Sequence, residues 1–212
     1  MKKKHLIESI IFTIITAIYI VLVKFVDVKP IGPNNSEVGL SAMNGWFQKL
    51  IGNNDFMYKL SELLGIVILL LVVIYGCIGL YQMIKRKNPL KVDKEILILG
   101  GFYVVVLILY VLFDKVAINY RPVLMDGELE PSFPSSHTML ALCVGLSSLI
   151  VSKDYFNKKY INIINTITCV LVALVLAARM LSGVHWLSDI FGGVLISCTL
   201  LAYFKLIYNY KK

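Results

Sequence analysis

Polar and charged side chains that can do chemistry gather in three short segments of the second half of the chain. These are 115–122 (KVAINYRP), 134–137 (PSSH) and 179–189 (RMLSGVHWLSD), and long apolar runs separate them. Together they hold three cationic side chains, two of the chain's three histidines and a carboxylate. Guanidinium and ammonium groups bind phosphate oxygens, and an imidazole can act as a nucleophile or a proton donor. The set predicts hydrolysis of a phosphate ester.

The histidines and the carboxylate divide into two candidate roles. His185 and Asp189 are four residues apart, a spacing that places both side chains on one face of a helix. The carboxylate could accept one imidazole N–H and fix the tautomer, which leaves the other nitrogen as a nucleophile or base. His137 would then be free to give a proton to a leaving oxygen. Alternatively, the pair only stabilises the start of a helix.

The three cations are expected at the outer ends of helices, where they would converge on one phosphate: Lys115, Arg121 and Arg179. Guanidinium forks bind phosphate oxygens through paired hydrogen bonds, and an ammonium group adds a compact charge. Alternatively, such side chains anchor helices at the membrane surface. Nearby carboxylates could also neutralise them instead: Asp114, Asp126, Glu128 and Glu130.

Two serines precede the fourth apolar run and could help to bind an anion. Ser135 or Ser136 can cap the helix that follows, which would aim free backbone N–H groups at a bound phosphate. Capping alone is the other interpretation. The apolar run, 138–151, has only 14 residues, or roughly 21 Å of helix against a hydrocarbon core of about 30 Å. The sequence therefore predicts that this site lies below the membrane surface.

The composition identifies the elements that must position these residues. Hydrophobic residues make up 58% of the 212 residues, charged residues only 16%, and the mean hydropathy is +0.78. These values exclude a soluble globular domain and indicate an integral membrane protein. Most apolar runs approach the ~20 residues that span a membrane as helix. We predict an all-α bundle of six transmembrane helices in one domain, 1–212: 6–26, 60–84, 96–113, 138–151, 161–178 and 190–207.

The basic residues predict the orientation of this bundle. The amino-terminal tail has three Lys or Arg residues, and the loop 85–94 has five. The loop 152–160 has three, and the carboxy-terminal end has three, including Lys211 and Lys212. These are 14 of the 21 Lys and Arg residues. Positive charge marks the cytoplasmic side. Both termini are therefore expected in the cytoplasm and the three segments outside. Because no basic patch with interleaved aromatic residues lies elsewhere, nucleic-acid binding is not expected.

The longest segment outside the predicted spans is 27–59. Within it, apolar residues recur at helical spacing: Leu40, Met43, Trp46, Phe47, Leu50 and Ile51. The pattern predicts an amphipathic helix between the first two spans, lying along the outer membrane surface. A helix packed on the bundle is the alternative. Either arrangement would cover the outer ends of the spans.

The three segments resemble the motifs of the type 2 phosphatidic acid phosphatase family, membrane lipid phosphatases that share an active site with vanadium haloperoxidases. The family pattern is K-x6-R-P, then P-S-G-H, then S-R-x5-H-x3-D. Here the third motif is complete from Arg179 to Asp189, with Ala178 where Ser is usual. The second has Ser136 in place of Gly. The first is one residue short, since five positions separate Lys115 from Arg121.

The resemblance implies a two-step phosphoryl transfer. His185 would attack phosphorus and become a phosphohistidine, with Asp189 holding the imidazole. His137 would protonate the leaving alkoxide and then activate the water that releases phosphate. The remaining residues would stabilise the phosphoryl oxygens: Lys115, Arg121, Arg179 and the amides of Ser135 and Ser136. No metal or other cofactor is required.

The implied substrates are lipid phosphates or diphosphates in a bacterial cytoplasmic membrane. Phosphatidate-like lipids, phosphatidylglycerol phosphate and undecaprenyl diphosphate all remain open, and no protein partner is expected. Two alternatives come from other classes. The cationic site could bind or transport lipid headgroups without catalysis, or the histidines and carboxylates could serve a metal-dependent hydrolase, although no HxH or HExxH pattern occurs. Haloperoxidase activity fits a membrane protein least.

Overall fold

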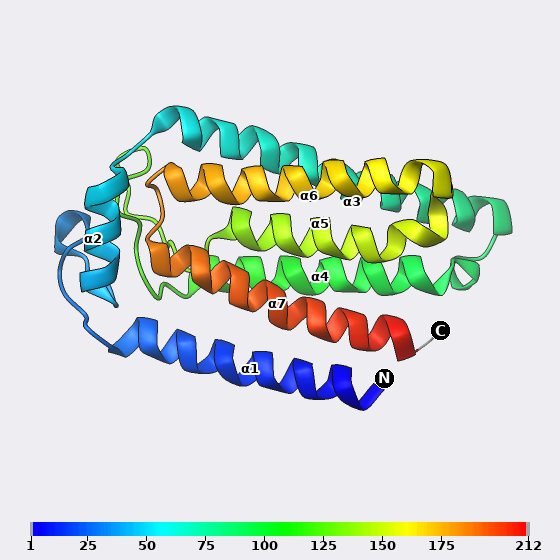
Figure 1. The fold of residues 1–212 in the computed structure, drawn as a ribbon, viewed down its shortest axis with the longest axis horizontal. Helices are drawn as coiled ribbons and strands as arrows, with labels where there is room; N and C mark the ends of the chain where they lie inside the picture. The colour runs from blue at the N-terminus through cyan, green and yellow to red at the C-terminus, as the bar shows by residue number, and fades with distance from the viewer. Residues whose placement is uncertain (1, 211–212) are drawn as a thin grey trace.

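Six long helices lie side by side in a computed structural model that describes residues 2–210 of the chain, and a short helix crosses one end of the bundle (Figure 1). Lys211 and Lys212 lie outside the described residues. The predicted fold class, six spans with an additional helix between the first two, is confirmed. The long helices are α1 (Lys2–Phe25), α3 (Asp55–Arg86), α4 (Lys94–Lys115), α5 (Ser136–Tyr155), α6 (Lys158–Leu181) and α7 (Leu187–Tyr210).

The bundle has two distinct ends. One, the terminal end, carries the start of α1, the end of α7 and the loops 87–93 and 156–157 (Figure 1). The opposite end, the site end, carries the short helix α2 (Ser41–Ile51), the loop 116–135 and the loop 182–186. All three segments singled out in the sequence therefore meet at the site end.

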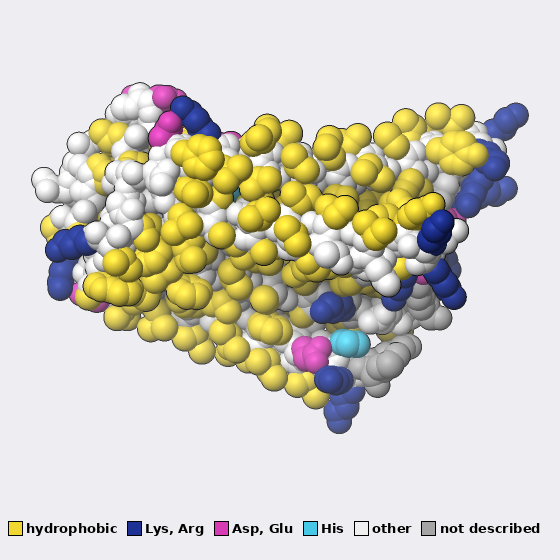
Figure 2. Space-filling view, turned by 45° about the horizontal axis from the view of Figure 1, so that its top comes forward, with side chains coloured by type: hydrophobic (Ala, Val, Ile, Leu, Met, Phe, Trp, Pro, Cys, Tyr) yellow, Lys and Arg dark blue, Asp and Glu magenta, His cyan; other side chains and the backbone are white. Residues whose placement is uncertain are grey.

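The surface of the long helices is apolar. All six are long and apolar enough to span a membrane, and Figure 2 shows hydrophobic side chains along the bundle with Lys and Arg gathered toward its ends. Residues such as Ile14, Ile18 and Ile66 are more than half exposed. Apolar side chains of this size face lipid rather than water. The chain is an integral membrane protein.

The prediction of a short fourth span was wrong. Helix α5 has 20 residues, or about 30 Å of helix, so its length gives no reason for a sunken site. Hydropathy missed its ends because α5 lies in the middle of the bundle, against α3, α4, α6 and α7. Ser152, just beyond the predicted end, is buried there instead of facing lipid, and its hydroxyl donates to the Leu149 carbonyl.

Helix α2 confirms the predicted amphipathic helix and shows which face meets the bundle. Its polar residues Ser41 and Asn44 are buried, whereas Trp46 and Leu50 are 63% and 67% exposed. Asn44 donates to the Ser188 hydroxyl at the start of α7 and accepts from the Ser188 amide. The polar face of α2 therefore packs on the site end, while the apolar face points away from the bundle.

Candidate active site

A cavity of about 60 Å³ opens at the site end between α4, α5 and the two loops. Ligand pockets for drug-sized molecules are typically 300–1,000 Å³, so this one suits a single small group. Three of the residues predicted from sequence line it: Arg121, Ser136 and His185. Tyr110 and Asp114 of α4 also contribute.

The loop between α6 and α7 holds His185 in place. Gly183 has a φ of +70°, and a Cβ there would lie 1.9 Å from the Gly52 carbonyl oxygen, so only glycine fits. The Gln48 side chain of α2 donates to the Gly183 carbonyl. On the other side, the indole of Trp186 donates to the Tyr120 carbonyl over 2.6 Å. These contacts fix the backbone on both sides of a histidine that is 2% exposed.

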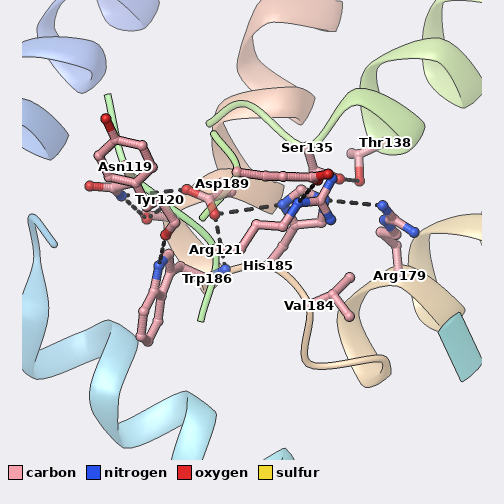
Figure 3. Close-up of polar contacts among 12 residues, drawn as sticks. Asn119, Tyr120, Arg121, Ser135, Thr138, Arg179, Val184, His185, Trp186 and Asp189 are labelled. Atoms are coloured by element: carbon pink, nitrogen blue, oxygen red, sulfur yellow. Dashed lines mark hydrogen bonds and ion pairs between the residues drawn. The ribbon is translucent and has the colours of Figure 1, made fainter. Parts of the chain in front are cut away.

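His185 and Asp189 do not share a helix, contrary to the expectation of one helical face. His185 precedes α7, and its Nδ1 lies 3.7 Å from Asp189 Oδ2, which is too long for a hydrogen bond. Asp189 accepts instead from the Trp186 amide at 3.0 Å and from Asn119 at 3.4 Å. Figure 3 shows His185 between Asp189 and Arg179. The carboxylate faces Nδ1 without bonding to it.

The contact between His185 and Arg179 identifies the tautomer. Arg179 Nη2 lies 3.2 Å from His185 Nε2, and a guanidinium can only donate. Nε2 is therefore unprotonated and the proton lies on Nδ1, toward Asp189. Burial, then the charges of Arg179, Arg121 and His137, hold the pKa of His185 well below its ordinary value. His185 is a neutral imidazole at pH 7, with its lone pair on the nitrogen beside the guanidinium.

Arg179 is only 1% exposed and joins α6 to α3. Its Nη1 donates to Ser61 at 3.1 Å and to Glu62 at 2.9 Å, and its guanidinium lies 5.3 Å from the centre of the Tyr58 ring. Its Nε is buried and has no hydrogen-bond partner among residues 2–210. A buried donor without a partner is costly, so this guanidinium has unused capacity for an anion.

Arg121 lies on a small hairpin in the loop 116–135. Its amide donates to the Glu130 carbonyl, and its Nε lies 3.1 Å from Glu130 Oε2. Glu130 is therefore one of the carboxylates that partly neutralise the predicted cations. The Nη1 of Arg121 is nevertheless buried with no hydrogen-bond partner in the described part of the chain. Like Arg179, it can still bind an oxygen.

The second segment is arranged differently from the prediction. Ser135 does not cap α5 with its side chain, which accepts from Thr138, and its amide donates to the Asp189 carbonyl. Its amide is therefore not available to a phosphate. Ser136 begins α5 and lines the cavity. Because the first amides of a helix lack an i−4 carbonyl, those from Ser136 onward are the ones that an anion could use.

His137 lies on the same first turn of α5 and turns toward α3. Its Nε2 is 3.2 Å from Glu62 Oε1. Its Nδ1 is buried and has no hydrogen-bond partner within residues 2–210. The structure thus brings both histidines to the site end, linked through Arg179 and Glu62.

Lys115 is not brought into the cavity. It is the exposed last residue of α4, it does not line the pocket, and it forms no ion pair within residues 2–210. Asp114, which stands seven positions before Arg121, lines the cavity instead. Successive helix residues differ by about 100° in direction, so the missing residue of the first motif turns Lys115 away and Asp114 inward.

Several site residues were missed in the sequence. Glu62 and Ser61 on α3 contact Arg179, and Asn119 contacts Asp189. Glu62 carried a usable signal, because a charged residue inside an apolar span marks a functional site. Asn119 carried none, since nothing in its spacing indicates its burial beside Asp189. Among residues 2–210, no three His, Cys, Asp or Glu side chains lie close enough together to hold a metal ion.

Comparisons with known proteins agree with the fold. A family model described as the PAP2 superfamily matches residues 101–212, slightly more than half of the chain and all three segments. The crystal structure of a transmembrane PAP2 type phosphatidylglycerolphosphate phosphatase from Bacillus subtilis matches with a TM-score of 0.61 over 97% of this chain and 98% of that chain, at 20% identity. At that identity the match shows a shared fold. No curated protein matches the sequence.

Proposed function

The chain belongs to the PAP2 superfamily, and we propose on that premise that it is a lipid phosphatase whose site is the cavity around His185. One observation carries the proposal: two guanidiniums, that of Arg179 buried and that of Arg121 mostly buried, flank a neutral imidazole, and each has a buried nitrogen that lacks a partner in the described structure. The apolar surface of the bundle supports a lipid as the substrate. A phosphate would supply the acceptors that Arg121 and Arg179 lack.

In the first step, the lone pair on His185 Nε2 attacks phosphorus. Arg179 must first transfer its hydrogen bond from Nε2 to a phosphate oxygen. As the N–P bond forms, the bond between phosphorus and the lipid oxygen breaks. The leaving oxygen takes a proton from His137, which reacts as an imidazolium and becomes a neutral imidazole. Asp189 stabilises the positive charge that develops on the His185 ring. The products of this step are the lipid alcohol and a phosphohistidine.

In the second step, water releases the phosphate. His137, now without its proton, takes one from a water molecule, and the hydroxide attacks phosphorus as the N–P bond breaks. His185 recovers its lone pair and His137 its proton. The Arg121 and Arg179 guanidiniums and the first amides of α5 stabilise the phosphoryl oxygens in both steps. Lys115 has no direct part in this account.

We propose that the site end faces outward, because the terminal end carries the basic loops that mark the cytoplasmic side. A membrane-impermeant thiol reagent applied to intact cells should label Glu128→Cys, at the site end, and leave Lys87→Cys unlabelled. Labelling of Lys87→Cys alone would reverse the orientation.

The function is tested by phosphate release from a panel of phosphatidate, phosphatidylglycerol phosphate and undecaprenyl diphosphate, ranked by kcat/KM. The purified protein should hydrolyse at least one of them, and chelation with EDTA should leave the rate unchanged, because the steps above use only this chain's side chains. Loss of activity in EDTA would favour the metal-dependent alternative. Binding of these lipids without phosphate release would favour a binding or transport protein.

A further inference from the structure

Helix α3 presents one polar stripe to the site, although no sequence motif marks it. Tyr58, Ser61, Glu62 and Gly65 recur at helical spacing, which places them on a single face. Ser61 and Glu62 bind Arg179, and the Tyr58 ring packs against its guanidinium. Glu62 is the acidic residue in this stripe, and its side chain is 40% exposed.

Glu62 fixes the position of the proton on His137. A single oxygen, Oε1, lies 2.9 Å from Arg179 Nη1 and 3.2 Å from His137 Nε2. A carboxylate only accepts, so a hydrogen bond across this contact requires the proton on Nε2. The absence of a side chain at Gly65 allows the contact, because a Cβ there would lie 2.9 Å from the His137 ring. Glu62 therefore keeps a proton on His137 Nε2.

A second pocket identifies where the leaving group lies. It has a volume of about 270 Å³ between α3, α4 and α5, and Glu62 and His137 lie among its mainly apolar walls of Ile66, Ile68, Leu69 and Leu140. It shares Tyr110 and Ser136 with the phosphate cavity. A phosphorus held beside His185 would thus direct its lipid oxygen toward His137, with the lipid in this apolar pocket. Glu62 lines this second pocket together with His137.

We infer that Glu62 selects lipid monophosphates over lipid diphosphates. This inference rests on the proposed function. When a monoester reacts, the group that leaves past Glu62 is an uncharged alcohol. When a diphosphate reacts, the leaving group is itself a phosphate, and its negative charge approaches the Glu62 carboxylate. Like charges repel, and the repulsion is stronger in a partly buried site than in bulk water. Glu62 is a specificity residue for the leaving group and a positioning residue for His137.

The test compares kcat/KM for phosphatidate and for undecaprenyl diphosphate in wild type, Glu62→Gln and Glu62→Asp. Glutamine keeps an oxygen that can accept from His137 and Arg179 but removes the charge. The ratio of diphosphate to monophosphate activity should therefore rise about tenfold or more in Glu62→Gln. It should stay within about threefold of wild type in Glu62→Asp, which keeps the charge. Glu37→Gln, which removes an exposed carboxylate from the loop between α1 and α2, is the matched control and should leave the ratio unchanged.

The outcomes separate the inference from the function on which it rests. If Glu62→Gln lowers both activities by the same factor, Glu62 is only structural and the inference is wrong. If wild type hydrolyses neither of these lipids nor phosphatidylglycerol phosphate, the proposed function fails and the inference fails with it. If Glu62→Gln does not fold, the inference is tested on the wild-type protein alone, by comparing two inhibitors. A lipid methylene diphosphonate should inhibit about tenfold more weakly than the matching lipid phosphonate, and equal inhibition would overturn the inference.

Discussion

Replacing His185 with alanine will reduce phosphate release from a lipid monophosphate by about four orders of magnitude or more, since the variant loses the attacking atom. The expectation rests on the Nε2 lone pair, which the Arg179 contact defines, and on the neutral state that burial imposes. The measurement is kcat for purified protein in detergent. Substrate binding should persist, because Arg121 and Arg179 remain.

The third histidine supplies the matched control. His5 lies in α1 at the terminal end, where it contacts Glu8. His5→Ala should keep kcat within about twofold of wild type, as expected for a surface change away from the site. A His185→Ala protein that is folded and still turns over substrate would show that another group attacks phosphorus.

The pH profile tests the same residue without mutation. The reactive form of His185 is the neutral imidazole, and its fraction falls only as pH drops through its pKa. Because that pKa lies well below 6.5, the acidic limb of kcat/KM assigned to His185 should also lie well below pH 6.5. Removing a nearby positive charge with Arg121→Gln should move this limb to higher pH. A limb at or above pH 6.5 in wild type would contradict a neutral, buried His185.

Arg179→Lys will reduce kcat/KM by about 10²–10³-fold, even though the positive charge is kept. The guanidinium of Arg179 reaches Ser61, Glu62 and His185 at once from a fully buried position. A lysine ammonium cannot span these three groups and still present two parallel donors to a phosphate. Lysine is preferred to alanine here, because alanine would leave Glu62 without its cation and risk unfolding.

Lys115→Met is the control for Arg179→Lys, because it removes the cation that the structure leaves outside the cavity. Its kcat/KM should stay within about threefold of wild type. Comparable losses in the two variants would mean that Lys115 reaches the phosphate after all. They would also restore the role that the sequence motif implied for this residue.

The sequence was sufficient for the architecture because its signals there are strong and repetitive. Six apolar runs and one amphipathic stretch predict the six spans and α2, since lipid imposes the same requirement on every turn of a spanning helix. The ends of α5 could not be predicted in this way. Ser152 looks polar in sequence but is buried against neighbouring helices, where hydropathy no longer reports the surroundings.

The site could be predicted only as far as the motifs extend. The motifs identify five residues that lie at one end of the bundle: Arg121, His137, Arg179, His185 and Asp189. Spacing alone could not show that a loop, rather than a helix, carries His185, because that depends on Gly183 meeting Gly52 from a distant segment. Nor could it show Glu62 between Arg179 and His137. Contacts between α3, α5 and α6 are tertiary, and no local pattern encodes them.

Phosphoryl transfer to His185 is tested most directly by detecting a phosphoryl group on this residue during turnover. Protein mixed with a lipid monophosphate carrying a radioactive phosphate is quenched in alkali, in which phosphohistidine survives, and the label is located by peptide analysis. We expect label on the peptide that contains His185, appearing before free phosphate and absent in His185→Ala. Steady release of phosphate with no label on His185 at any time would contradict it.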